Sequence, residues 1–91
     1  MNTDFKPSFF NSIKKIIDPA LKEEIEQVIK SVEDATAKKD IPALKKLKGK
    51  KKKPIYYRIK IDGYRIGVTI ENDIVTFAIF MPRKDFYRFF P

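Results

Sequence analysis

Hydrophobic residues recur at every third or fourth position between residues 8 and 37, a spacing that places them on one side of a helix. The pattern predicts a short helix with Ser8 as its N-cap. It predicts a second helix that begins at Asp18-Pro19 and ends near Ala37, so that the two form a helical hairpin. The apolar stripes are Phe9, Phe10, Ile13, Ile16 and Ile17 in the first helix, and Leu21, Ile25, Val28, Ile29 and Val32 in the second.

From Ile55 onward the hydrophobic positions alternate with polar ones, which is typical of strands. Strands are predicted over 55–61, 64–70 and 75–79, joined into an antiparallel meander by two-residue turns at 62–63 and 72–73. Residues 1–6 give a weak strand signal, and 40–49 read as a connector in which 43–47 fit a helical turn. The expected fold is α+β, with the helical hairpin packed on one face of a small antiparallel sheet in a single domain spanning 1–91.

The predicted turns also determine which side chains share a face of the sheet, because side chains alternate along a strand. The first hairpin sets Lys60 opposite Arg65, and the second sets Ile66 opposite Ile79. One face is then the core: Ile59, Ile61, Ile66, Val68, Ile70, Val75, Phe77 and Ile79. The other face carries cations above a floor of small side chains: Tyr56, Arg58, Lys60, Arg65, Gly67, Thr69, Thr76, Ala78 and Phe80.

The chain has 20 Lys and Arg against 12 Asp and Glu, a net charge of +8. Residues 1–40 hold 7 basic and 8 acidic residues, whereas residues 41–91 hold 13 and 4, so the whole excess lies in the second part. Such asymmetry suggests a polyanionic partner, either nucleic acid or an acidic protein segment. The like charges of Lys60 and Arg65 repel across the sheet, and no acidic residue on their face relieves them. This favours an anion-binding face over a merely solubilising one.

The composition excludes several classes of site. There is no cysteine and no histidine, which rules out disulfides, cysteine- or histidine-ligated metal and Ser-His catalysis. No apolar run approaches the length of about 18 residues that a membrane span needs, and the N-terminus has no apolar signal region. We therefore expect a cytoplasmic protein that uses no metal or other cofactor.

Three stretches of the chain together resemble the RelE/ParE superfamily of bacterial toxins: LKKLKG at 44–49, YYRIKIDGYRIGVTIEND at 56–73 and PRKDFYRFFP at 82–91. The match is closer to the RelE-like mRNA interferases than to the gyrase-poisoning ParE branch. The resemblance implies the toxin of a type II toxin–antitoxin module, an endoribonuclease that inhibits translation by cutting mRNA in the ribosomal A site without a metal. It also implies a cognate antitoxin, and a true N-terminal strand in the sheet.

By this resemblance the catalytic residues are Arg58, Lys60, Arg65, Arg83 and Tyr87. RNA cleavage through its own 2′-OH needs proton removal, stabilisation of a phosphorane and protonation of the 5′-oxygen. Arg65 and Arg83 suit the phosphorane. Lys60, crowded by cations, is the candidate base, and Tyr87 the group that orients the 2′-OH or stacks on a base. In an alternative assignment, Arg83 serves the leaving 5′-oxygen instead of the phosphorane.

The chain departs from the family pattern at two places, and it also carries a run of lysines. Pro82 occupies a position that is often histidine in relatives, and the chain ends soon after Tyr87, so no C-terminal helix is expected. The run Lys50, Lys51, Lys52 and Lys53 fits ribosomal RNA docking and a solvated loop equally well.

Two other functions remain open alongside the nuclease. One is a non-nuclease toxin of the same fold that binds a target such as gyrase, and the other is a generic RNA-binding module. The presence of all five candidate residues favours the nuclease, and the free toxin is expected to be a monomer.

Overall fold

The computed structural model describes residues 1–48 and 53–91, so most of the lysine run, Lys50 to Lys52, lies outside the described residues. Along the chain the elements are β1 (Asn2–Phe5), α1 (Pro7–Ile13), α2 (Pro19–Asp34), a short 3₁₀-helix η1 (Lys38–Asp40), β2 (Leu44–Lys46), β3 (Ile55–Ile61), β4 (Tyr64–Glu71), β5 (Ile74–Pro82) and α3 (Arg83–Phe89).

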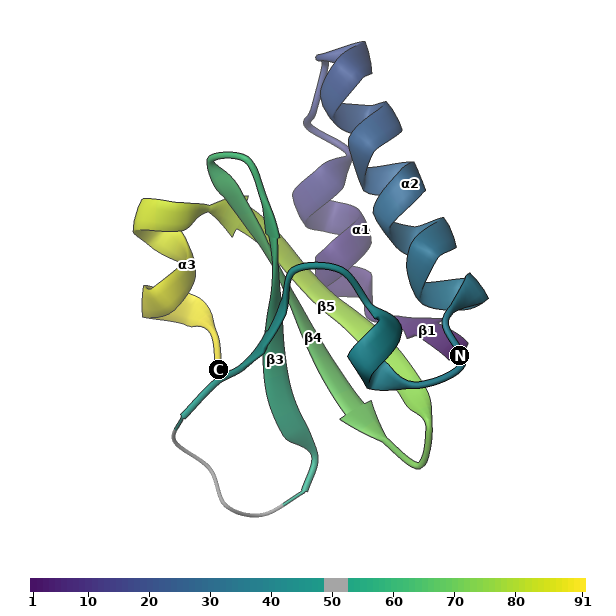
Figure 1. Cartoon of the computed structure of the whole chain (residues 1–91). Coiled ribbons are helices and arrows are strands. Elements are labelled where there is room, and N and C mark those ends of the chain that lie inside the picture. Colours follow the sequence, from purple (N-terminus) through teal and green to yellow (C-terminus); the bar gives the residue numbers. More distant parts are fainter. Residues whose placement is uncertain (49–52) are drawn as a thin grey trace.

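One mixed sheet forms the centre of the molecule, with the strand order β1-β5-β4-β3-β2. The predicted β3–β4–β5 meander is confirmed, and β1 adds to it in parallel with β5. The helices α1 and α2 lie on one side of the sheet and α3 lies on the other (Figure 1). The α+β class is therefore confirmed, with more strands than the hydrophobic pattern alone indicated. Among the described helices, none is both long and apolar enough to cross a membrane.

The two N-terminal helices differ in how well their ends were predicted. The cap of α2 is confirmed, since Oδ1 of Asp18 accepts a hydrogen bond from the backbone N–H of Ala20 at 3.0 Å. For α1 the predicted Ser8 cap is wrong: Lys6 is the N-cap, and Pro7, with its fixed φ, occupies the first helical position. Ser8 instead donates its hydroxyl to the carbonyl of Ala78 in β5.

Both helices also end earlier than their apolar stripes suggest. The first stops at Ile13, and the second at Asp34 rather than near Ala37. After α2 the carboxylate of Asp40 accepts hydrogen bonds from the hydroxyl of Thr36 at 2.8 Å and from the backbone N–H of Ala37 at 3.2 Å. This local capping starts η1 and competes with continuation of the helix.

The helical turn predicted over 43–47 is wrong, because Leu44–Lys46 form the edge strand β2. This strand is antiparallel to β3, and Lys45 lies opposite Arg58. Ala43 has a φ of 59°, a left-handed conformation that turns the chain into the strand. A short, lysine-rich strand is a common way to end a sheet without inviting further pairing.

The predicted register of the second hairpin holds only to a β-bulge. Val68 pairs with Phe77 as expected, but beyond the Gly67/Val68 irregularity Ile66 pairs with Phe80 and not with Ile79. The extra residue reverses the faces, so Phe80 is buried in the main core and Ile79 turns to the opposite side.

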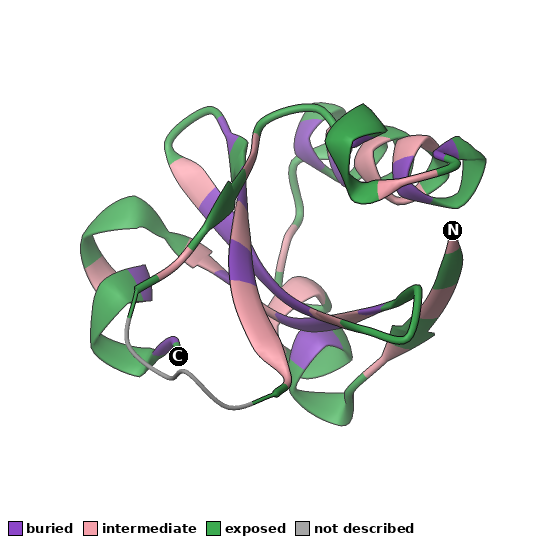
Figure 2. Cartoon of the chain, turned by 60° about the horizontal axis from the view of Figure 1, so that its bottom comes forward, coloured by how far each residue is buried: buried purple, intermediate pink, exposed green. Residues whose placement is uncertain are grey.

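Two hydrophobic clusters lie on opposite faces of the sheet, and Figure 2 shows the buried positions concentrated along its strands. The larger cluster lies under α1 and α2, where Phe9, Val32 and Phe77 are fully buried. The smaller one lies under α3 and contains Phe86 and Phe90. The expectation of no C-terminal helix is therefore wrong. The i, i+4 spacing of these two phenylalanines gives α3 an apolar side that packs on β4 and β5.

A cationic candidate active site

The first hairpin brings the arginines of β3 and β4 to one face in the register predicted, with Lys60 opposite Arg65 and Arg58 opposite Gly67. Arg65 is buried, and its Nη1 donates hydrogen bonds to the carbonyl oxygens of Asp62 at 3.0 Å and Tyr64 at 2.8 Å. These contacts hold the Arg65 guanidinium at the end of the hairpin where the chain turns.

The neighbouring Arg58 is half-buried and anchored separately. Its Nη1 donates to the carbonyl of Ala43 at 2.7 Å, at the entry to β2. Both arginines are thus tied to backbone carbonyl groups, and no acidic side chain neutralises them through those contacts. Their positive charge remains available to an anionic ligand.

The Nε atom of Arg65 is buried, and no hydrogen-bond partner for it occurs among the described residues. Buried donors are nearly always paired, so an unpaired one calls for a specific reason. In a cationic cluster, an N–H group of this kind suits an oxygen of a phosphate.

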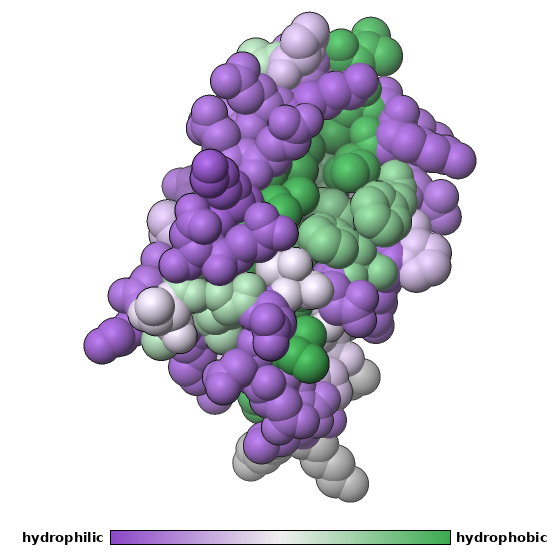
Figure 3. Space-filling view, turned by 90° about the vertical axis from the view of Figure 1, so that its right-hand side faces the viewer, coloured by the Kyte–Doolittle hydropathy of each residue, from purple (hydrophilic) through white to green (hydrophobic). Residues whose placement is uncertain are grey.

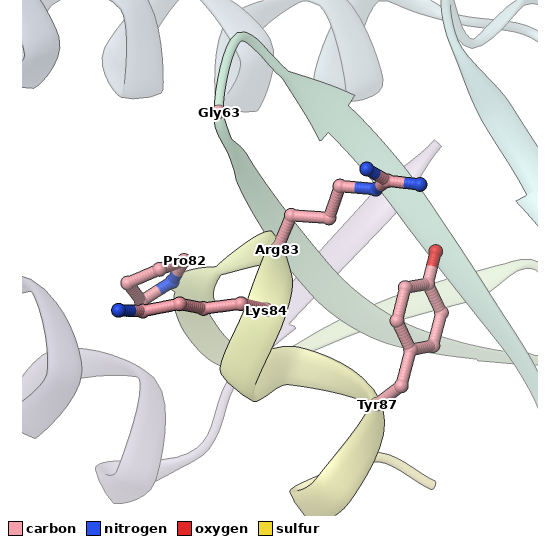
Figure 4. Close-up of a pocket in the computed structure, with 5 residues that line it drawn as sticks. All are labelled: Gly63, Pro82, Arg83, Lys84 and Tyr87. Atoms are coloured by element: carbon pink, nitrogen blue, oxygen red, sulfur yellow. The ribbon is translucent and has the colours of Figure 1, made fainter.

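The helix α3 supplies the other two residues, Arg83 and Tyr87. Their i, i+4 spacing places them on one side of the helix, and they line a cavity of about 600 Å³ together with Gly63, Pro82 and Lys84. Figure 4 shows the side chains of Arg83 and Tyr87 pointing to the same side, whereas Lys84 points the opposite way.

Tyr87 connects α3 to the hairpin. Partial burial raises the pKa of its phenol, but hydrogen bonding from Arg65 and Arg58, together with their positive charge, outweighs this effect. The net result is a pKa below the ordinary value of 10.0. Tyr87 therefore ionises more readily than a free tyrosine, beside cations that stabilise its phenolate.

Tyr87 joins four of the five candidate residues into one site. It interacts with Arg58 and Arg65, and it lines the same cavity as Arg83. Lys60 is exposed and lies farther out: it lines a different cavity, of about 340 Å³, together with Glu24 and Asp62. Lys53, the described member of the lysine run, is exposed.

The open floor of small residues predicted beside the cations is wrong in part. The ring of Phe90 lies so close over Gly67 that a Cβ there would be 2.8 Å from it, and Ala78 is buried in the same cluster. The helix α3 and the C-terminal Phe90 thus cover this part of the face. The cationic side chains lie beyond them, at the end of the hairpin where the chain turns. The i, i+4 spacing of Phe86 and Phe90 is the sequence signal for a helix that covers this part of the face.

Comparisons with known proteins concern the chain as a whole. No family model matches the chain. Toxin RelE3 of Methanocaldococcus jannaschii is 28% identical over 92 residues, covering 100% of both chains. The crystal structure of a RelB-RelE antitoxin-toxin complex from Methanococcus jannaschii has a chain with a TM-score of 0.77 and 26% identity, covering 97% of this chain and 99% of that one.

A second solved structure, the archaeal RelE-RelB complex from Pyrococcus horikoshii OT3, has a TM-score of 0.71 over 90% of this chain and 93% of its own. At 13% identity it speaks for the fold alone. The chain is thus similar over its full length to a named RelE toxin, and it shares its fold with chains of two RelB-RelE complexes.

Proposed function

We propose that this chain is a RelE-type toxin of a type II toxin–antitoxin pair and that it cleaves mRNA on the ribosome. The observation that carries this proposal is the position of Tyr87, which lines one cavity with Arg83 and meets Arg58 and Arg65 of the hairpin, whose positive charge lowers the pKa of its phenol. A proton acceptor surrounded by fixed cations is what phosphodiester cleavage by an internal hydroxyl requires. A generic RNA-binding module would need the cations but not the phenol.

In the proposed reaction the 2′-OH of the RNA attacks the adjacent phosphorus, and the bond to the 5′-oxygen of the next nucleotide breaks. A base of the protein takes the proton of the 2′-OH as the attack begins, and the departing 5′-oxygen takes a proton from solvent water or from Arg83. Arg65 and Arg83 neutralise the negative charge that develops on the phosphorane. The products are a 2′,3′-cyclic phosphate and a 5′-hydroxyl, and no metal or cofactor takes part.

Tyr87 is the stronger candidate for the base that removes the 2′-OH proton. Its pKa is lowered toward the working pH by the two hairpin arginines, and it lines the same cavity as Arg83. Lys60 remains the second candidate, because it lies directly opposite Arg65 in the sheet. The two assignments differ in which substitution removes the pH dependence of the rate.

A surface of this chain between α1 and α2, separate from the cationic site, suits the proposed antitoxin. A cavity of about 360 Å³ is lined there by the side chains of Phe10, Ile13, Ile16, Ile25 and Ile29. Phe10 is 53% exposed although it is a large hydrophobic residue. The space-filling view from the side of α2 shows hydrophobic side chains gathered in a hollow between hydrophilic ones (Figure 3). Exposed apolar hollows of this kind mark interaction sites.

We propose that an amphipathic segment of the antitoxin occupies this groove. Lys14, Lys22 and Glu26 line it as well, so its net charge is positive, and acidic residues beside the apolar ones of the segment would complement the two lysines. The RelE relatives from Methanococcus and Pyrococcus were crystallised with RelB, which supports a protein partner for this chain.

Three smaller proposals concern the location of the protein, its oligomeric state and its lysine run. The protein works in the cytoplasm, where ribosomes and mRNA are. It is monomeric when it is free of antitoxin. The lysines from Lys50 to Lys53 add contacts with ribosomal RNA that do not depend on sequence.

Cleavage of an mRNA by the purified protein, with and without programmed ribosomes, tests the function. We expect slow cutting of naked RNA, a rise of orders of magnitude with ribosomes, and no change with EDTA, because only the ribosome aligns the reacting atoms. Arg83→Ala should lose this activity, whereas Lys84→Ala, whose side chain points away from Tyr87, should keep it. Magnesium-dependent cutting of free RNA to 5′-phosphate ends would refute the proposal.

A further inference from the structure

The two-residue turn at Asp62 and Gly63 is a common anchor for both arginines of the proposed phosphate site. Nη1 of Arg65 donates to the Asp62 carbonyl at 3.0 Å. The backbone N–H of Arg83, the first residue of α3, donates to the Gly63 carbonyl at 2.9 Å. The shape of this turn therefore sets where the Arg65 guanidinium lies and where α3 begins.

Asp62 holds the unusual conformation of the turn. Its φ is 49°, in the left-handed region that most side chains avoid, whereas Gly63 lies outside that region. Aspartate and asparagine tolerate this conformation better than other residues because their short polar side chains bond locally. A side chain without that tolerance would shift the turn, and with it the two carbonyl groups.

On its other side the turn meets α2 through a pair of carboxyl groups. The pKa of Glu24 is raised above 4.5, chiefly by a hydrogen bond with the Asp62 side chain, then by partial burial and by the charges of Asp62 and Asp18. Two carboxyl groups can share a hydrogen bond only while one is protonated. The other charged or titratable groups lining the adjoining cavities are Lys15 after α1, Asp18 before α2, Lys60 of β3 and Tyr64 of β4.

We propose that Asp62 is a positioning residue: it holds the β3–β4 turn so that the turn's carbonyls fix Arg65 and the start of α3 at Arg83, while the protonated carboxyl group of Glu24 braces it from α2 in acid. Because Tyr87 lies on α3 and meets Arg65, a displaced turn would separate these two groups. The consequence for cleavage rests on the proposed function, but the positioning itself is measurable without RNA.

The pKa of Tyr87 is the reporter, since Arg65 and Arg58 lower it. It is measured from the ultraviolet absorbance of tyrosinate, as the difference between each protein and its Tyr87→Phe counterpart. Asp62→Asn, which keeps the left-handed tolerance, should leave the Tyr87 pKa where it is in the wild type. Asp62→Val should raise it toward 10, and Asp62→Ala, the milder change, should raise it in the same direction if Asp62→Val does not fold.

Ribosome-dependent cleavage provides the second readout. Asp62→Ala should lower kcat by about tenfold or more with KM for programmed ribosomes unchanged, because orientation and not binding is lost. Asp62→Asn should restore wild-type kcat. An unchanged Tyr87 pKa in both Asp62→Ala and Asp62→Val would overturn the inference. Absence of cleavage by the wild type would instead refute the proposed function, and the Tyr87 titration would still decide the role of Asp62.

The Glu24 brace is tested by the pH dependence of unfolding in urea. A group whose pKa is raised by folding stabilises the fold in acid and loses that contribution as the pH rises through its folded pKa. Glu24→Gln, whose amide donates to Asp62 at every pH, should match the wild type in acid and exceed its stability toward neutral pH. Glu23→Gln, the exposed neighbour, should show no such divergence. Parallel curves for wild type and Glu24→Gln would remove Glu24 from the inference.

Discussion

The hydroxyl oxygen of Ser12 in α1 accepts a hydrogen bond from the backbone N–H of Phe80 at 3.0 Å, directly after the bulge in β5. A bulge leaves ladder groups without partners, and here the helix supplies one. The Ser12 hydroxyl in turn donates to the Phe9 carbonyl at 2.7 Å, which fixes its direction. The helix and the bulge therefore stabilise each other.

Ser12→Ala should lower the free energy of unfolding by about 1 to 3 kcal/mol, because the Phe80 N–H would lose its partner. Urea unfolding followed by circular dichroism measures this. Asn11→Ala, an exposed neighbour on the same helix, should change stability by less than about 0.5 kcal/mol. Equal effects of the two substitutions would contradict the role of Ser12.

Gly67 and Phe90 should be coupled, because a Cβ at Gly67 would lie 2.8 Å from the Phe90 ring. Gly67→Ala is expected to cost about 1 to 3 kcal/mol by displacing the ring. In a Phe90→Ala background the same substitution should cost little, and a double-mutant cycle measures the difference. Additive effects would show that the ring does not pack on Gly67.

Arg65→Ala and Arg83→Ala should both abolish cleavage but differ in stability. Arg65 is buried and supplies hydrogen bonds to two carbonyl groups of the turn, so its loss should cost about 1 to 3 kcal/mol. Arg83 is exposed, and its side chain can be removed at less than about 0.5 kcal/mol. Chemical denaturation of both variants measures this difference in stability. Equal losses in the free energy of unfolding would argue against it.

The groove between α1 and α2 predicts a variant that escapes its antitoxin. Ile29→Glu puts a charge into the apolar lining and should weaken antitoxin binding about tenfold or more, with ribosome-dependent cleavage intact. Lys30→Glu, the exposed neighbour outside the lining, is the control for charge alone. Calorimetry with the antitoxin, and growth assays with both proteins expressed, would measure the effect. Unchanged binding of Ile29→Glu would place the antitoxin elsewhere.

The sequence was most informative where local pattern and tertiary contacts agree. Alternation from Ile55 onward and the turn at Asp62-Gly63 predicted the first hairpin with its register, and hence the shared face of Arg58 and Arg65. The cap at Asp18 followed from the side-chain chemistry of a helix start. The resemblance to RelE toxins added the N-terminal strand, whose own signal is weak because β1 depends on pairing with β5.

What the sequence did not reveal depends on contacts between distant segments. The β5 bulge needs the α1 serines to satisfy it, so a count of alternating residues could not show that Ile79 leaves the core. The strand β2 exists through its pairing with β3, although its one leucine and two lysines also suit a helix. The helix α3 is short, and packing of Phe86 and Phe90 on the sheet stabilises it rather than propensity.

The pH dependence of cleavage should identify the base. If Tyr87 removes the 2′-OH proton, its ionised form is active, so kcat rises about tenfold per pH unit below its pKa and levels off above it. Since Arg65 and Arg58 lower that pKa, the inflection should lie below 10, and Arg58→Gln should move it upward. Arg88→Gln, which changes an exposed arginine of α3, should leave it in place. An inflection that persists in Tyr87→Phe and disappears in Lys60→Met would assign the proton transfer to Lys60 instead.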